Sequence, residues 1–132
     1  LLFFREIGAD MIGLGPFIPN PDTPLSLERG GTFEKARKIM ALVRLLMPDI
    51  NIPATTAMET LSPDGRMLAL QSGANVVMPN VTDLVHKKYY NLYPGKSGED
   101  TPADYVKRAL EEKIESIGRF VSEDFGFRKK NM

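Results

Sequence analysis

The sequence predicts an α/β fold, in which parallel strands alternate with helices as in part of a (β/α)₈ barrel or of an open doubly wound sheet. One helix-to-strand junction occurs twice, as Gly-Ala-Asp-Met-Ile at residues 8–12 and as Gly-Ala-Asn-Val-Val at residues 73–77. The elements follow in the order helix end, strand, helix, strand, helix, strand, which implies right-handed crossovers. Such a small parallel sheet leaves both edges unpaired. We therefore expect the chain to complete a larger barrel, or to be unstable alone.

Composition sets the limits within which a function must be sought. A chain of 132 residues with 42% apolar and 26% charged residues is typical of one soluble globular domain, and no membrane span is visible. Basic and acidic residues number 17 each, so no net field favours nucleic acid or an anionic surface. Without cysteine, the chain can form no disulfide and no thiolate-held metal site. The absence of cysteine says little about the compartment, which we expect to be the cytoplasm.

The N-terminal end of the sequence lacks the marks of a complete protein. It opens Leu-Leu-Phe-Phe-Arg-Glu, without an initiator methionine or the basic region of a signal peptide. We expect a segment of something longer.

The first elements are the last turns of a helix over residues 1–7, closed by Gly8, and a short strand that begins at Met11. The strand runs into a loop over residues 16–24, where each proline fixes φ and lacks an N–H. Gly13 and Gly15 suit a strand end that another backbone or a ligand approaches closely. This stiff loop indicates the rim of a binding site, and a proline-rich turn without a ligand is the alternative.

The next helix is expected over residues 33–47, with Thr32 as N-cap and Glu34 in the first turn. Its apolar residues recur at steps of three and four, at Phe33, Ala36, Met40, Val43 and Met47. A short strand over residues 50–56 follows. The sequence Ser62-Pro63-Asp64 then predicts a helix over residues 65–71, with Ser62 as N-cap and Pro63 at the first helical position.

The C-terminal part contains one more strand and, we expect, two more helices. The strand covers residues 76–80, a short helix residues 83–90 and a loop residues 91–100, after which Thr101-Pro102 opens the last helix. Val106, Leu110, Ile114, Ile117 and Val121 give that helix one apolar face. Residues 128–130 should be a frayed tail. We divide the chain into a barrel part over residues 1–96 and a loop with an amphipathic helix over residues 97–132.

Candidate site residues lie where the predicted strands end, because the carboxyl ends of parallel strands share one face. Residues 13–18, 55–59 and 78–80 should meet there. Their polar groups are the hydroxyls of Thr55, Thr56 and Thr60, the carboxylate of Glu59, the thioether of Met78 and the amide of Asn80. The cluster holds no nucleophile–base pair and no histidine. It can hydrogen-bond a polar ligand but cannot supply acid–base or covalent catalysis by itself, so we assign no catalytic and no metal-binding residue.

Other candidates carry less weight. His86 lies beside two lysines and is expected to be solvated rather than catalytic or metal-binding. Tyr89, Tyr90 and Tyr93 either close over a pocket or pack against a neighbouring helix. Gly-Leu-Gly-Pro-Phe at residues 13–17 lacks the third glycine of the dinucleotide-binding fingerprint, which disfavours a nucleotide fold of that kind.

Several motifs, taken in order, resemble one family. They are Ile-Gly-Leu-Gly-Pro-Phe-Ile-Pro at 12–19, Asp-Thr-Pro-Leu at 22–25, Ile-Pro-Ala-Thr-Thr-Ala at 52–57, Gly-Ala-Asn at 73–75, Met-Pro-Asn at 78–80 and Tyr-Pro-Gly-Lys at 93–96. With them the chain resembles the C-terminal portion of the HydE-type [FeFe]-hydrogenase maturases, which are radical S-adenosylmethionine (SAM) enzymes of the biotin synthase group. The likeness covers residues 1–96 and again residues 114–128.

The resemblance implies a (β/α)₈ barrel of which this chain holds roughly strands six to eight. In that family a [4Fe–4S] cluster, held by Cys-x-x-x-Cys-x-x-Cys after the first strand, cleaves SAM to a 5′-deoxyadenosyl radical. No part of that cysteine motif is present here. The N-terminal part of the same barrel would have to supply it, so this segment alone should be inactive and should form the far wall of the cavity.

Site roles follow from the resemblance by position. Gly15, Phe17 and Ile18 match the stretch that packs on the cofactor's adenine, and Thr55 and Thr56 match positions that hydrogen-bond a substrate carboxylate or similar anion. Met78, Asn80 and Tyr93 match positions that border the substrate pocket. The implied substrate is a small amino-acid-derived or cysteine-bound iron species for the hydrogenase di-iron site, and other hydrogenase maturation proteins are possible partners.

One departure from the family pattern follows Lys96. Many relatives carry cysteines there for an accessory iron–sulfur cluster, but this chain has Ser-Gly-Glu-Asp at residues 97–100, so we expect no accessory cluster from this segment. Two alternatives stay open: another biotin synthase-like enzyme, such as a mutase or a sulfur-inserting synthase, and a non-catalytic half-barrel that binds a partner.

Overall fold

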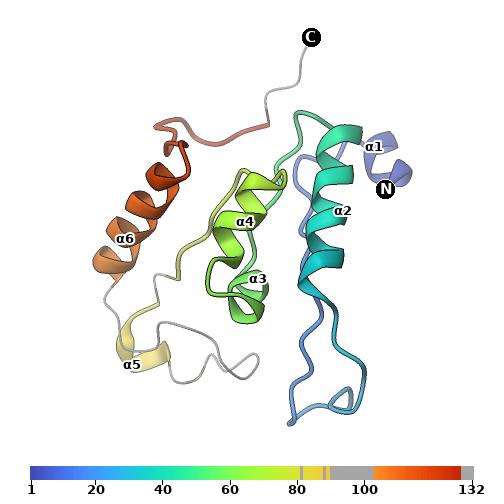
Figure 1. Cartoon of the computed structure of the whole chain (residues 1–132), viewed down its shortest axis with the longest axis vertical. Coiled ribbons are helices and arrows are strands. Elements are labelled where there is room, and N and C mark those ends of the chain that lie inside the picture. The colour runs from blue at the N-terminus through green and yellow to red at the C-terminus, as the bar shows by residue number, and fades with distance from the viewer. Residues whose placement is uncertain (81, 88, 90–102, 129–132) are drawn as a thin grey trace.

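The computed structural model describes residues 1–80, 82–87, 89 and 103–128. Its helices are α1 (Leu2–Glu6), α2 (Phe33–Leu46), α3 (Thr56–Leu61), α4 (Gly65–Gln71), α5 (Leu84–Lys87) and α6 (Ala103–Ser116). In Figure 1, α2, α4 and α6 follow one another across the view, and the segment after α6 extends from the top of that helix to above α4. The proline-rich loop between α1 and α2 extends from the opposite end of the molecule.

The predicted strands form only isolated parallel bridges within the described residues, Met11 with Asn51 and Pro53 with Val76. Ile12 N donates to Asn51 O at 2.9 Å, and Ala54 N donates to Val76 O at 2.8 Å. The parallel direction agrees with the prediction, but the expectation of continuous strands over residues 50–56 and 76–80 was wrong. One reason is local, because Pro53 has no N–H with which to extend a ladder.

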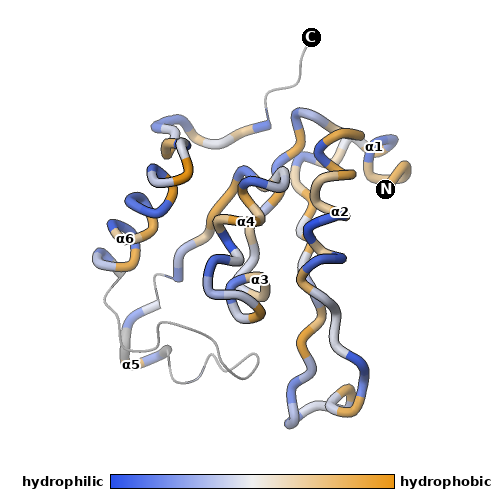
Figure 2. Tube along the Cα trace, in the orientation of Figure 1, coloured by the Kyte–Doolittle hydropathy of each residue, from blue (hydrophilic) through white to orange (hydrophobic). Residues whose placement is uncertain are grey.

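The core forms where α2 and α4 pack on the bridged segments. Met40 and Val43 of α2 and Ile50 and Ile52 of the following segment are fully buried, as is Met58 of α3. The side chain of Thr32 accepts a hydrogen bond from Lys35 N at 3.3 Å, which confirms the predicted N-cap of α2. The predicted apolar face is confirmed too, since Ala36, Met40, Val43 and Met47 are all buried. Figure 2 shows the alternation of hydrophobic and hydrophilic residues along α2 and α6 that one buried face requires.

The start of α4 differs from the prediction. A separate helix, α3, begins at Thr56, the last residue of the predicted strand, and runs to Leu61, where no element was predicted. Ser62 closes this helix by donating its N–H to Met58 O at 3.1 Å. Asp64, not Ser62, is the N-cap of α4, and its side chain makes no capping bond. Gly65 allows the two helices to abut, because a Cβ built there would lie 1.9 Å from Met58 O. Of the β-branched pair that favoured a strand, Thr55 keeps an extended backbone as the N-cap, and Thr56 is the first residue of the helix.

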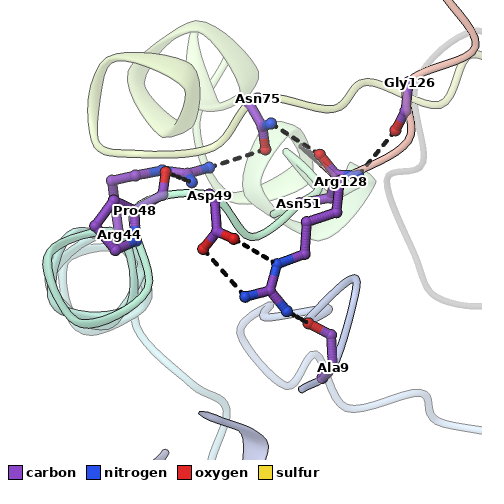
Figure 3. Close-up of polar contacts among 8 residues, drawn as sticks. All are labelled: Ala9, Arg44, Pro48, Asp49, Asn51, Asn75, Gly126 and Arg128. Atoms are coloured by element: carbon purple, nitrogen blue, oxygen red, sulfur yellow. Dashed lines mark hydrogen bonds and ion pairs between the residues drawn. The ribbon is translucent and has the colours of Figure 1, made fainter. Parts of the chain in front are cut away.

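The segment after α6 fastens the amino ends of the bridged segments. Arg128 donates to both carboxylate oxygens of Asp49, at 2.9 and 3.1 Å, and to Ala9 O at 2.5 Å (Figure 3). Arg119 donates to Ala74 O at 3.3 Å. Residues 9, 49 and 74 each lie two positions before a bridging residue, so this segment crosses one end of all three. The prediction of a frayed tail was wrong for Arg128, while residues 129 and 130 lie outside the described part.

Asparagine side chains join the bridged segments at this same end by hydrogen bonds. Asn75 Oδ1 accepts from Ile52 N at 2.8 Å and from Arg44 Nη2 at 2.9 Å, and Asn75 Nδ2 donates to Asn51 Oδ1 at 3.0 Å (Figure 3). Asn51 Nδ2 in turn donates to Gly126 O at 2.9 Å. Asn75 therefore pairs the segment after α4 with the segment after α2, and it supplies backbone-like hydrogen bonds where the ladder is short.

The remaining elements agree with the sequence in part. Gly8 closes α1 with φ +64° as predicted. Helix α5 lies within the helix expected over residues 83–90, of which residues 88 and 90 are outside the described part. Helix α6 ends at Ser116 before Gly118, whose φ is +74°, so Val121 is not part of its apolar face. The loop over residues 91–100 and the helix start at 101–102 lie outside the described residues. Across the described ranges, none of the helices is both long and apolar enough to cross a membrane.

Candidate functional site

A pocket of about 310 Å³ opens at the carboxyl side of the bridges, opposite the end that the C-terminal segment fastens. It is lined by Gly15, Pro16, Ala54, Thr55, Thr56, Ala57 and Met78. These residues follow Met11, Pro53 and Val76, the bridging residues of the segments they belong to. The structure thus brings together four of the predicted site residues, Gly15, Thr55, Thr56 and Met78, at the end of the sheet where the sequence places them.

Gly15 lies against Thr55. A Cβ built at Gly15 would lie 2.9 Å from Thr55 Oγ1, closer than real Cβ contacts, whereas a Cβ at Gly13 would meet nothing within 4 Å. The close neighbour of Gly15 is thus a side chain, whereas approach of another backbone or of a ligand to Gly13 and Gly15 stays a prediction. The lack of a side chain at Gly15 makes room for the Thr55 hydroxyl, which a β-carbon would contact too closely.

The Thr55 hydroxyl is buried, and within the described residues it has no hydrogen-bond partner. Thr55 is the N-cap of α3, with φ −73° and ψ 154°, but its side chain makes no capping bond. A buried hydroxyl without a partner costs about 1 to 3 kcal/mol. We therefore expect the Thr55 hydroxyl to hydrogen-bond to a ligand or to another part of the polypeptide.

The Thr56 hydroxyl has a hydrogen-bond partner, Arg66, which does not itself line the pocket. Arg66 Nη2 donates to Thr56 Oγ1 at 3.4 Å, and Arg66 Nε lies 3.1 Å from Glu59 Oε2. The Arg66 and Glu59 side chains are 11% and 22% exposed. The sequence placed Glu59 in the site, but the structure pairs it with Arg66 and it does not line the pocket. Thr60 does not line it either, because its hydroxyl donates to Thr56 O at 3.1 Å.

Arg66 is the neighbour that sequence reasoning missed. Glu59 and Arg66 lie on different helices, α3 and α4, so no helical spacing links them. The only available signal was the Asp-Gly-Arg run at residues 64–66, where a glycine precedes an arginine at a helix start.

Three other predicted site residues, Phe17, Ile18 and Asn80, do not line this pocket. Phe17 and Ile18 are on the loop that follows Pro16, where Phe17 O accepts from Gly31 N at 2.8 Å; neither side chain lines the pocket. Asn80 uses its Oδ1 to accept from Thr82 N at 3.0 Å, which is a local turn contact. Tyr93 lies outside the described residues.

The pocket can bind a ligand but offers no acid–base pair. Its polar atoms are two adjacent hydroxyls and backbone groups, and Met78 adds a thioether that is 59% exposed as a residue. Across the residues that the structure describes, no group of three or more His, Asp or Glu side chains could hold a metal ion. His86 is exposed, as expected, and its Nδ1 lies 2.8 Å from Oδ1 of Asp83, the residue before α5.

Comparisons with known proteins give the family context. A family model described as Biotin and Thiamin Synthesis associated domain matches residues 14–111. The chain is 48% identical over 130 residues to the [FeFe] hydrogenase maturase subunit HydE of Thermotoga maritima, across 98% of this chain and 37% of that protein. It is 37% identical over 68 residues to a 3-methylornithine synthase of Methanosarcina barkeri, across 52% of this chain and 19% of that one. These matches confirm the resemblance seen in the motifs. The chain spans little more than a third of the length of the HydE relative.

Proposed function

Because the chain belongs to the Biotin and Thiamin Synthesis associated domain family, we propose that it is the C-terminal part of a HydE-type radical SAM enzyme. It lines the cavity in which SAM and substrate meet during assembly of the [FeFe]-hydrogenase di-iron site. The observation that carries this proposal is the pocket formed by Gly15, Thr55, Thr56 and Met78. The buried Thr55 hydroxyl, which lacks a hydrogen-bond partner among the described residues, and the adjacent Gly15 support a ligand-binding role for this wall.

The free edges of the bridged segments support completion by the N-terminal part of a barrel. Ile12 N bonds to Asn51 O, and Val76 N and O bond to Ile52 O and Ala54 N. Because backbone groups alternate along an extended chain, Met11 and Val77 present theirs to the outer edges. Large apolar side chains are exposed as well, notably Phe120, Phe125 and Phe127 at 85%, 92% and 81%. We propose that about strands six to eight of a (β/α)₈ barrel lie here, and that the rest of the polypeptide covers these edges.

The chemistry is divided between this chain and the rest of the enzyme. When bound at the [4Fe–4S] cluster, SAM supplies the radical chemistry. This chain has no cysteine, so the cluster ligands lie elsewhere and this segment holds no accessory cluster. Its own residues bind and orient: Thr55 and Thr56 donate hydrogen bonds to the carboxylate of an amino-acid-derived or cysteine-bound iron substrate. Met78 gives that substrate an apolar contact.

Further site assignments belong to the same proposal. Gly15, Phe17 and Ile18 lie along the loop that would face the adenine of SAM, and Asn80 and Tyr93 border the substrate. We propose that the enzyme works in the cytoplasm with other hydrogenase maturation proteins.

The test replaces both hydroxyls in the full-length enzyme. Thr55→Val with Thr56→Val should weaken substrate binding by about 1.5 to 3 kcal/mol for each hydrogen bond lost to a charged group. Cleavage of SAM in the absence of substrate should persist. Thr60→Val is the matched control, because that hydroxyl bonds to Thr56 O and not to the pocket. Unchanged substrate affinity in the double variant would remove both threonines from the site.

A mutase of the same superfamily is a second candidate, favoured by the match to the 3-methylornithine synthase over about half of the chain. Product analysis of the full-length enzyme separates the two, since a mutase rearranges an amino acid without any iron species. A non-catalytic half-barrel is tested by expressing residues 1–132 alone. A monodisperse protein that melts cooperatively would favour the half-barrel, and aggregation would favour the enzyme part.

A further inference from the structure

We propose that Arg66 is a specificity-determining positioning residue, which fixes the Thr56 hydroxyl as a hydrogen-bond donor towards the pocket. The pocket then selects a ligand group that only accepts hydrogen bonds, such as a carboxylate, over its neutral amide. This inference rests on the proposed function and deepens it, because it names the chemistry that the threonine pair recognises.

The direction of the hydrogen bond decides the polarity of the hydroxyl. A guanidinium has five donors and no acceptor, so in the 3.4 Å contact between Arg66 Nη2 and Thr56 Oγ1 the threonine oxygen must accept. The single hydroxyl hydrogen is then left for another partner. Among the described residues the structure gives it no acceptor, and Thr56 lines the pocket. The hydrogen is therefore available to a bound ligand.

The packing of α3 against α4 places the arginine. Gly65 begins α4 so close to Met58 O that no Cβ fits between them, and Arg66 therefore faces the first residue of α3. Its side chain is 11% exposed, and Glu59 lies 3.1 Å from its Nε. Arg66 Nε makes a close ion pair with Glu59 but no hydrogen bond among the described residues, while Nη2 donates to Thr56 Oγ1. Two nitrogens of one planar group thus reach the two partners, whereas a lysine would have to make both contacts with a single nitrogen.

The charge of Arg66 is compensated, so its effect on a ligand is mainly one of orientation. Glu59 neutralises it at close range, whereas the oriented hydroxyl points its dipole at the ligand. Thr55, the residue before Thr56, lines the same pocket, and its buried hydroxyl has no hydrogen-bond partner among the described residues. The hydrogen bond from the Thr56 hydroxyl to a carboxylate oxygen is charge-assisted and is stronger than one to a neutral amide. An amide would also bring N–H donors that an oriented donor cannot accept.

The test measures ligand preference in the full-length enzyme by titration calorimetry with L-cysteine and with L-cysteine amide. The unaltered enzyme should prefer the carboxylate. Arg66→Met combined with Glu59→Gln removes both charges and leaves no buried ion unpaired; it should lower that preference roughly tenfold. Glu59→Gln alone keeps the arginine and leaves its positive charge uncompensated, so the preference for the carboxylate should be kept or become stronger. Should the combined variant fail to fold, Arg66→Lys is measured instead, and the same loss of preference is expected.

A mutant cycle separates positioning from a general structural effect. If Arg66 acts through Thr56, then adding Arg66→Met and Glu59→Gln to Thr56→Val should change the affinity for L-cysteine no further. Additive losses would overturn the inference, as would an unaltered enzyme with no preference for the carboxylate. If Thr56→Val by itself leaves the affinity unchanged, the proposed role of Thr56 fails and this inference fails with it. If Thr56→Val weakens binding and the charge-removing variant keeps the full preference, the inference about Arg66 alone is refuted.

Discussion

Replacing either of two neighbouring threonines by valine should change stability in opposite directions. Thr55 Oγ1 is buried without a hydrogen-bond partner among the described residues, whereas Thr56 Oγ1 accepts from Arg66 Nη2 at 3.4 Å. Valine has nearly the same shape as threonine, so packing changes little in both variants. The difference between them therefore isolates the two hydroxyls.

The magnitudes follow from the two environments. Thr55→Val removes a desolvated hydroxyl and should stabilise the ligand-free, full-length enzyme by about 1 to 3 kcal/mol. Thr56→Val removes an acceptor from a buried guanidinium. Because the bond is long and Arg66 keeps its ion pair with Glu59, the expected loss is at the low end, about 0.5 to 1.5 kcal/mol. The same Thr55→Val change should weaken ligand binding, so this variant should be more stable than the unaltered enzyme but bind the ligand less tightly.

Urea unfolding of the ligand-free enzyme measures both changes. A shift of the midpoint with an unchanged slope reports a change in the free energy of unfolding. Thr55→Ser is the control, because it keeps the hydroxyl and should not reproduce the gain. If Thr55→Val destabilises the enzyme as much as Thr56→Val does, the Thr55 hydroxyl has a partner in the folded protein, and the argument for a ligand there is refuted.

Two further changes test the packing and the fastening of the fold. Gly65→Ala would place a Cβ 1.9 Å from Met58 O, so α3 and α4 would have to move apart. Urea unfolding should show that the free energy of unfolding falls by about 1 to 3 kcal/mol or more. Gly13→Ala is the control, because a Cβ there meets nothing within 4 Å and stability should change little. The hydrogen bonds from Arg128 hold the pKa of Asp49 below its usual value. The ionised carboxylate thus stabilises the fold above the unfolded-state pKa of about 3.9, and this contribution is lost as pH falls through the lower folded-state pKa. Asp49→Asn should be less stable than the unaltered enzyme at pH 6, and the gap should close on acidification; a gap independent of pH would contradict this assignment.

Local features of the fold could be predicted from the sequence because they depend on residues close together in the chain. The N-cap Thr32, the apolar face of α2 and the left-handed Gly8 each involve neighbours within a few positions. The repeated glycine-initiated junctions predicted parallel pairing of the segments that contain Met11, Asn51 and Val76. The motifs also indicated the family that the comparisons show.

Contacts between distant residues were decided by tertiary structure. Asp49 and Arg128 are 79 residues apart, and nothing in the sequence near Arg128 distinguishes it from the lysines that follow. Arg66 reaches Thr56 only because Gly65 lets α4 abut α3. Tertiary packing also decided that residues 56–61 are helical and that the predicted strands form only isolated bridges. Local preference is weak for short β-branched and proline-containing stretches, so the packing around them determines which conformation they take.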